Sequence, residues 1–282
     1  MSDSVYLSYS SQKLYTTCPK KYRFRYVLRD KTRGDVSKTI LGSVLGKLFE
    51  WFYSKKIWMH NDPATYLLSL VDEVKHLVIN KEDSSLRANG SFMSSLNTDL
   101  NKYIVPSLEV IRKNKLVTPM SVSEIDLTTI CYHKKHDFSI KMGGRADFIH
   151  GYDLNDVWIM DGKASKHREK YVDAEQLIWY STQFYLKYHS VPTRLGFLFY
   201  CFPDDPIKWI SYDDQSVRDL LDKTFDIANR VKSEKFDALP SGECHRCEFQ
   251  SKCDDGKKYI IARRKETGGV IENSIFDLET VK

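Results

Sequence analysis

The sequence predicts an α/β protein in which helices flank a central mixed β-sheet. Apolar residues recur at helical spacing through the first 115 residues, and the spacing changes to two near Ser121. A long amphipathic segment then separates the last strands. The order helices, strands, helix, strands, helix is typical of a sheet covered on its faces. The chain has 282 residues, 41% of them apolar, which is enough to bury one sizeable core.

Helices are expected over most of the N-terminal part. Apolar residues recur at a spacing of three or four in the segments 14–22, 41–52, 63–80 and 92–114. The last two segments make up a helical insertion, residues 55–115, which matches no motif. Pro119 follows the insertion closely and marks its end.

Strands and further helices are expected over residues 120–235, the predicted core. Alternating or continuous apolar patterns predict three mostly antiparallel strands over 122–133, 138–153 and 157–165. A helix over about 172–189, strands over 194–202 and 207–212, and a helix over 213–235 complete this region. No element is predicted after Cys253.

Composition limits the classes of partner. The formal net charge is +5, which is compatible with a polyanionic partner such as DNA. The sequence has no apolar run long enough to span a membrane and does not start like a signal peptide, so we expect a cytoplasmic protein with no membrane partner. In a reducing compartment the six cysteines are metal-ligand candidates before they are disulfide candidates.

Cations and aromatic rings alternate near the N-terminus. This pattern is equally typical of a DNA contact and of a solvated helix face. The residues are Lys13, Tyr15, Lys20, Lys21, Tyr22, Arg23, Phe24, Arg25, Tyr26 and Arg29.

Two acids stand at matching places on neighbouring predicted strands. Asp147 lies in GGRADFI, and Asp161 lies in IMDGKAS with Lys163 two residues later. Residues two apart on a strand point to one face, so Asp161 and Lys163 project together. The two carboxylates and the Gly162 carbonyl suit Mg²⁺ or Mn²⁺. Lys163 is then placed to hold or deprotonate a water that attacks a phosphodiester.

The alternative interpretation is that these are surface acids at strand ends, since a D-x-K triplet is common. The context argues against it. Asp161 ends the run VWIM, which reads as a strand buried on both faces, where an unpaired carboxylate is costly. A metal or a cation must compensate its charge.

Gln176 and Tyr180 follow on one face of the next predicted helix. GGRAD, a strand ending in DGK and a helix with Q-x-x-x-Y together resemble the RecB-like branch of the PD-(D/E)XK nuclease superfamily. The resemblance implies a restriction-endonuclease-like core within a single nuclease domain over residues 1–282. It also implies that Asp147 and Asp161 bind Mg²⁺ or Mn²⁺, that Lys163 is catalytic, and that Gln176 and Tyr180 shape the site or contact DNA.

One element departs from that family pattern. RecB-like nucleases usually carry a metal-binding histidine in an N-terminal helix, in a setting like G-x-x-x-H, and this sequence has Gly46 there. Glu50 lies one turn later and is the proposed replacement, because lambda-exonuclease-like relatives use a helical glutamate. The alternatives are that Glu50 is an ordinary exposed glutamate, or that the site holds one metal or none. Glu124 is a weaker candidate for the same place.

Cysteines cluster near the C-terminus. Cys244, Cys247 and Cys253, within residues 240–256, form an incomplete tetrahedral set. Cys18, in residues 1–30, is the proposed fourth ligand, because TTCPKKYRFRY resembles the N-terminal cysteine segment of the iron–sulfur nucleases, such as CRISPR-associated RecB-like exonucleases and AddB. This resemblance implies a structural [4Fe–4S] cluster. Zinc is the competing metal, with His245 as a further possible ligand. Cys131 and Cys201 lie in apolar strand contexts that favour packing.

The leading functional hypothesis is a divalent-metal-dependent DNA exonuclease. The resemblance implies a role in DNA recombination, replication or repair, on single-stranded DNA or DNA with free ends. The alternatives are a catalytically weak nuclease-fold subunit that binds DNA or acts as a scaffold, which the absence of the usual histidine favours, and a zinc-stapled adaptor.

Overall fold

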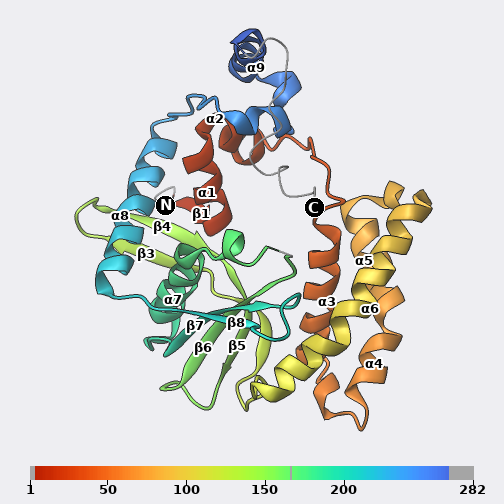
Figure 1. Cartoon of the computed structure of the whole chain (residues 1–282). Coiled ribbons are helices and arrows are strands. Elements are labelled where there is room, and N and C mark those ends of the chain that lie inside the picture. The colour runs from red at the N-terminus through yellow and green to blue at the C-terminus, as the bar shows by residue number, and fades with distance from the viewer. Residues whose placement is uncertain (1–3, 166, 267–282) are drawn as a thin grey trace. The chain divides into compact units, whose positions relative to one another are not determined.

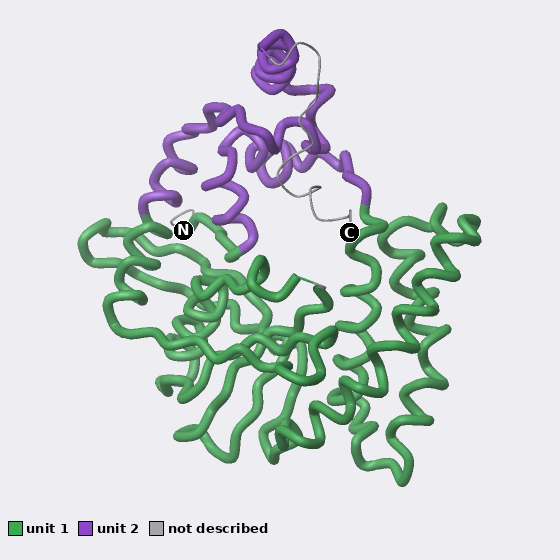
Figure 2. The backbone as a smooth tube through the Cα atoms, viewed as in Figure 1, with its two compact units in different colours: residues 1–9, 36–225 green, residues 10–35, 226–282 purple. Residues whose placement is uncertain are grey.

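The computed structural model describes residues 4–165 and 167–266. Its contacts divide the chain into two compact units (Figure 2). Unit 1 comprises Met1–Tyr9 and Val36–Phe225, and unit 2 comprises Ser10–Asp35 and Asp226–Lys282. Each unit therefore combines segments that are far apart in the sequence.

Unit 1 is built on a five-stranded sheet. The pair β6–β7 is parallel and the other three pairs are antiparallel, so the predicted mixed sheet is confirmed. In their order across the sheet, the strands are β2 (Val122–Asp126), β5 (Arg145–Gly151), β6 (Val157–Lys163), β7 (Arg194–Phe199) and β8 (Ile207–Ile210).

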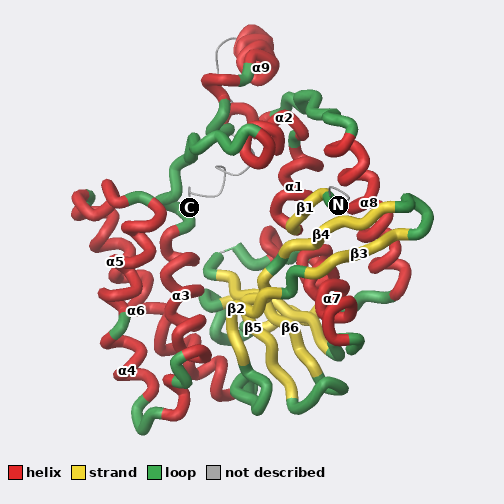
Figure 3. Tube along the Cα trace, turned by 180° about the vertical axis from the view of Figure 1, so that it is seen from behind, coloured by secondary structure: helices red, strands yellow, loops and turns green. Residues whose placement is uncertain are grey.

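A second sheet of three strands lies in the same unit (Figure 3). Its order is β1 (Val5–Ser8), β4 (Phe138–Gly143) and β3 (Thr129–His133). The pair β1–β4 is parallel and the pair β3–β4 is antiparallel. Strand β1 was not predicted from the sequence, because four residues are too few to establish an alternating pattern.

The prediction of three strands between residues 122 and 165 was wrong, because the first two segments are each divided. Residues 122–133 form β2 and β3, and residues 138–153 contain β4 and β5, with the halves in different sheets. The break between β2 and β3 lies beside the break between β4 and β5. There the Leu127 N–H donates to the Gly144 carbonyl over 2.9 Å. A Cβ at Gly144 would collide with the amide of the buried Gln183, so a glycine is needed where the chain changes sheet.

Helices cover both faces of the five-stranded sheet (Figure 1). Side chains of Phe148, Trp158 and Met160 join an apolar core with the helices on one face. The residues that alternate with them point to the other face, where α7 (Ala174–Tyr188) packs on β6 and β7. The helices on the face of Phe148, Trp158 and Met160 are α3 (Ile40–Ser54), α4 (Pro63–Ser69), α5 (Val71–Glu82) and α6 (Gly90–Lys113).

The predicted helices are confirmed with small changes. Residues 63–80 form two helices, α4 and α5, which meet at Leu70. The predicted helix 172–189 is α7, and 213–235 is α8 (Asp214–Lys232). None of the described helices is both long and apolar enough to cross a membrane.

Unit 2 gathers short helices from both ends of the chain. They are α1 (Tyr9–Thr17), α2 (Pro19–Tyr22), a π-helical turn (Arg23–Val27), 3₁₀ turns at Gly242–Arg246 and Gln250–Lys252, and α9 (Asp254–Glu266). Helix α9 was not predicted because only Gly256 and Ile260 of its thirteen residues are buried. A segment with so small a buried face has no apolar periodicity to detect.

Candidate active site and cysteine cavity

Three carboxylates form a row across neighbouring strands of unit 1. In the β2–β5 pair, Ser123 faces Phe148 and Ile125 faces Ala146, so Glu124 faces Asp147. In the β5–β6 pair the last register pair is Phe148 with Met160, and the next position brings Asp147 opposite Asp161. Directly opposite residues share a face of the sheet. Asp147 and Asp161 therefore share the α7 side of the sheet, and the charge of Glu124 acts on Asp147 from the neighbouring strand.

Glu124 has a left-handed backbone, with a φ of 55°. A non-glycine residue in this region costs of order 1–3 kcal/mol, and such residues cluster at functional sites. The carboxylate of Glu124 lies 3.4 Å from the guanidinium of Arg145, which shares a strand face with Asp147. The fold thus keeps a strained acid beside Asp147.

Lys163 and Gln176 hold the carboxylate of Asp161. The Lys163 ammonium lies 2.5 Å from Asp161 Oδ2. Gln176 Nε2 donates to Asp161 Oδ1 over 2.7 Å, and Gln176 Oε1 accepts from Lys163 Nζ over 3.0 Å. Gln176 Nε2 also lies 3.3 Å from the Tyr180 hydroxyl. One glutamine of α7 therefore fixes both the acid and the lysine of β6.

Burial sets the electrostatics of the acids. Asp161 is 3% exposed. Burial raises its pKa, although the charge of Lys163 opposes the rise. The pKa of Asp147 is raised well above its usual range by burial and then by the charges of Asp161 and Glu124, against a 2.9 Å hydrogen bond from the Gly162 N–H. The carboxylates thus repel one another in a poorly solvated site. A bound cation would offset this repulsion.

Tyr200 closes the site from the α3 side of the sheet. A Cβ at Gly162 would collide with the Tyr200 hydroxyl, so the glycine permits close packing. Among the described residues this buried hydroxyl has no hydrogen-bond partner. Burial, and then the charge of Asp147, raise the pKa of Tyr200 well above its usual range. Sequence reasoning missed this residue, because it follows an apolar strand with no motif around it.

Glu50 lies on α3, and its carboxylate is engaged locally. Lys47 Nζ lies 2.6 Å from each of the two Glu50 carboxylate oxygens. The Glu50 backbone carbonyl accepts a 3.0 Å hydrogen bond from Ser123, the residue before Glu124. The structure therefore places Glu50 next to the strand that carries Glu124, with its side chain paired to a lysine.

The structure brings most of the predicted site residues into one connected group. Asp161, Lys163, Gln176 and Tyr180 are linked through Gln176, and Asp147 joins them through the Gly162 N–H. Glu124 was only a weak candidate, and its position opposite Asp147 depends on a strand break that the sequence did not reveal.

Four of the six cysteines line one cavity of ≈ 60 Å³ in unit 2. They are Cys18, Cys244, Cys247 and Cys253. A Cβ at Gly256 would lie 3.5 Å from the Cys253 sulfur and 3.7 Å from the Cys244 sulfur, so the glycine leaves room between them.

Backbone amides point at two of these sulfurs. The Ser241 N–H donates to Cys244 Sγ, and the Gly256 N–H donates to Cys253 Sγ, each over 3.4 Å. Hydrogen bonds to sulfur are among the features that tune iron–sulfur clusters. Cys131 lies apart in β3, where burial raises the pKa of its thiol to about 11. Its burial agrees with the packing role expected from the sequence.

Ion pairs join the two chain segments of unit 2. Lys20 Nζ lies 2.6 Å from Asp255, and Glu248 binds both Lys21, at 2.9 Å, and Arg25, at 2.5 Å. Three of the N-terminal cations thus pair with acids near the C-terminal cysteines. For these three, the structure assigns an internal partner in place of the DNA contact considered from the sequence.

Comparison with known proteins identifies the family. The sequence matches the PD-(D/E)XK nuclease superfamily over residues 6–254. No curated protein sequence matches it. One solved structure, described as "Crystal structure of SSO0001", is 11% identical and covers 91% of this chain and 89% of its own, with a TM-score of 0.39. That likeness is too low to bear on fold or activity. The family match spans most of the chain, and the chain therefore belongs to the PD-(D/E)XK nuclease superfamily, whose substrates are nucleic acids.

Proposed function

We propose that the protein is a divalent-metal-dependent DNA exonuclease of the RecB-like branch, acting in DNA recombination, replication or repair. The observation that carries the proposal is the row Glu124, Asp147 and Asp161, with Lys163 bridged to Asp161 by Gln176. The order of the motifs GGRAD, DGK and Q-x-x-x-Y supports the RecB-like assignment.

The acids fit a hard cation such as Mg²⁺ or Mn²⁺. They are poorly solvated, and burial raises the pKa of Asp147 and of Asp161, so Lys163 and the Gly162 N–H compensate their ionised forms only in part. Asp161 Oδ2 is buried and is contacted by the ammonium of Lys163. Asp147, Asp161 and the Gly162 carbonyl would hold the ion, with Glu124 as the third carboxylate. Glu50, on α3, is the alternative third carboxylate.

The residues around the acids then have separate tasks. A bound divalent ion stabilises the charge that develops on a phosphodiester and lowers the pKa of a bound water. Lys163 orients the attacking water and stabilises negative charge on the phosphate. Gln176 keeps Lys163 and Asp161 at a fixed separation, and Tyr180 borders the same site and contacts DNA. Preorganised positions of this kind lower the barrier because little reorganisation remains during reaction.

The cysteine cavity is proposed to hold a structural [4Fe–4S] cluster that ties the ends of the chain together. The amide donors to Cys244 and Cys253, and the distant fourth cysteine Cys18 in the same lining, support a cluster over zinc.

The proposed activity is tested with linear DNA carrying a label at one end. Wild type should release labelled products from linear single- or double-stranded DNA when Mg²⁺ or Mn²⁺ is present, and should leave circular DNA of the same sequence intact. Cutting of circles would replace the exonuclease assignment with an endonuclease. Failure to bind Mn²⁺ in a calorimetric titration would favour the scaffold alternative.

A further inference from the structure

A tight turn in unit 1 brings two histidines together, away from the carboxylate row. His133 ends β3, and His136 lies in the turn that leads to β4. The His136 and Asp137 N–H groups both donate to the His133 carbonyl, over 3.1 and 3.0 Å. This turn places the two imidazole rings 4.8 Å apart.

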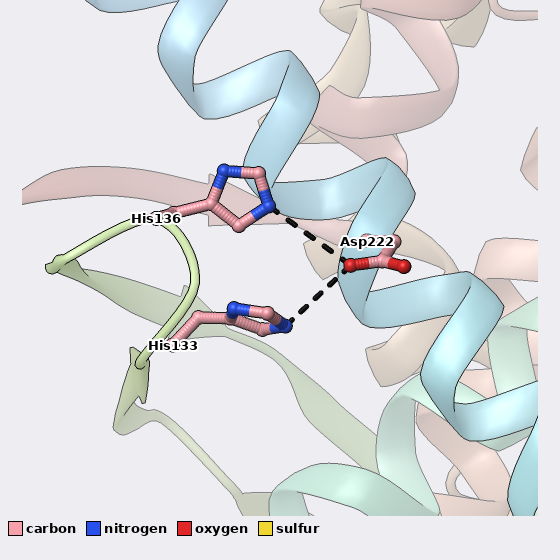
Figure 4. Close-up of side chains that lie close together, drawn as sticks. All are labelled: His133, His136 and Asp222. Carbon is pink, nitrogen blue, oxygen red and sulfur yellow. Dashed lines mark ion pairs between the residues drawn. The ribbon is translucent and has the colours of Figure 1, made fainter.

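An aspartate from α8 faces both rings (Figure 4). Asp222 Oδ1 lies 3.5 Å from His133 Nε2 and 3.9 Å from His136 Nε2. A donor atom from each of the three residues lies within 4.8 Å of the other two. Residues almost 90 positions apart in the sequence thus present two nitrogens and one oxygen to a common point.

We propose that His133, His136 and Asp222 form a second metal site, which binds Zn²⁺ or a similar first-row divalent ion. Around tetrahedral zinc with bonds of about 2.0 Å, neighbouring ligand atoms stand about 3.3 Å apart. The observed separations of 3.5 and 3.9 Å need only small side-chain movements to reach this value. Two imidazoles with one carboxylate suit zinc and its neighbours better than Mg²⁺, which prefers oxygen ligands.

Packing holds the histidines in place before any ion binds. The ring of Phe225 lies 4.9 Å from the His133 ring and 5.5 Å from the His136 ring. Phe138 packs against His136 at 6.3 Å. An apolar wall of this kind lowers the entropy lost when ligands are fixed around a metal. The Asp222 side chain is 51% exposed, which leaves a fourth position open to water.

Lys135 competes for the same aspartate. Its ammonium lies 3.6 Å from Asp222 Oδ1, and its side chain is 69% exposed. The cluster therefore has a rival interpretation as an ion-pair network without a metal. The two interpretations predict opposite effects of Lys135→Ala. Removing a competing cation strengthens metal binding at this site, whereas it weakens an ion-pair network.

The experiment titrates the full chain with Zn²⁺. The bound zinc per chain is then measured after dialysis against excess Mg²⁺. Wild type is compared with Asp222→Asn, His136→Gln and Lys135→Ala. Any zinc at the carboxylate row or the cysteines is common to all four proteins, so the difference between them counts this site alone. Circular dichroism confirms that each variant is folded.

Wild type should hold one more zinc per chain than Asp222→Asn and His136→Gln. Lys135→Ala should keep that zinc and bind it about threefold more tightly, as expected for loss of one nearby exposed charge. Equal zinc content in wild type and the folded Asp222→Asn variant would overturn the proposal. Weaker zinc binding by Lys135→Ala would also overturn it.

Discussion

Glu124 faces Asp147 across the β2–β5 pair, at a position where the Glu124 backbone takes a φ of 55°. The charge of Glu124 contributes to the raised pKa of Asp147. A strained acid that also destabilises its neighbour has no evident value for folding. Metal binding explains the arrangement, because a bound divalent cation stabilises the negative charges of both Glu124 and Asp147.

Glu124→Gln should therefore weaken Mn²⁺ binding at least about tenfold, or about 1.4 kcal/mol, through loss of one carboxylate ligand. Glu50→Gln is the matched variant, since the Glu50 carboxylate is already paired with Lys47. It should have a smaller effect. Isothermal titration calorimetry measures both. If Glu50→Gln weakens binding and Glu124→Gln does not, the third carboxylate comes from α3.

Asp147→Asn should stabilise the metal-free protein at neutral and higher pH. The pKa of Asp147 is raised in the folded state, so its contribution to stability is complete below the unfolded pKa and is lost as pH rises. Each unit of a raised pKa corresponds to about 1.4 kcal/mol. Urea denaturation at about pH 8 and about pH 4 measures the difference, which should disappear at the lower pH.

Mn²⁺ provides the control for this prediction. It should raise the melting temperature of wild type and have much less effect on Asp147→Asn, because a ligand stabilises only the protein that binds it. A metal-free Asp147→Asn variant that is less stable than wild type at neutral pH would show that the carboxylate is already compensated.

Gly162→Ala should destabilise the fold by about 1–3 kcal/mol, because its Cβ collides with the buried Tyr200 hydroxyl. Gly46→Ala is the matched control. A Cβ there has no neighbour within 4 Å, and alanine favours a helix over glycine by about 1 kcal/mol. The double variant Gly162→Ala with Tyr200→Phe should recover much of the loss in a thermal melt. If the double variant does not regain stability, the contact with the Tyr200 hydroxyl is not the cause of the loss.

Cys247→Ser should remove the brown colour, with its broad absorption near about 400 nm, that anaerobic preparation is expected to give. Cys131→Ala is the control, since Cys131 is buried in β3 and does not line the cavity, and its colour should match wild type. Absorption spectra and iron analysis test both variants. A colourless wild type with stoichiometric zinc would assign the cavity to zinc and leave the nuclease proposal intact.

Local patterns in the sequence predicted the mixed sheet, its helices and the placement of Asp161 and Lys163 on one face of a strand. Asp161 and Lys163 are two apart on one strand, and Gln176 and Tyr180 are four apart on one helix, so spacing alone relates the members of each pair. The predicted strands also placed Asp147 near Asp161. These features depend on residues that are close in sequence or on adjacent strands.

Features that depend on distant contacts were not predicted. The strand break at Leu127 and Gly144 lies against the side chain of Gln183 on α7, and the register beyond it sets Glu124 opposite Asp147. The Asp222 contact joins a turn to a helix almost 90 residues later. Periodicity carries no information about such pairs, because burial and register fix them only in the folded chain.

The most direct test of the central claim compares wild type with Asp161→Asn in cleavage of end-labelled linear DNA with Mg²⁺ or Mn²⁺. Asparagine keeps the size of the side chain and its acceptor for Gln176 but removes the charge. Asp161→Asn should lose at least about a hundredfold in rate, because a bound ion contributes several kcal/mol to the stability of the transition state. Equal cleavage by the two proteins, purified in the same way, would contradict it.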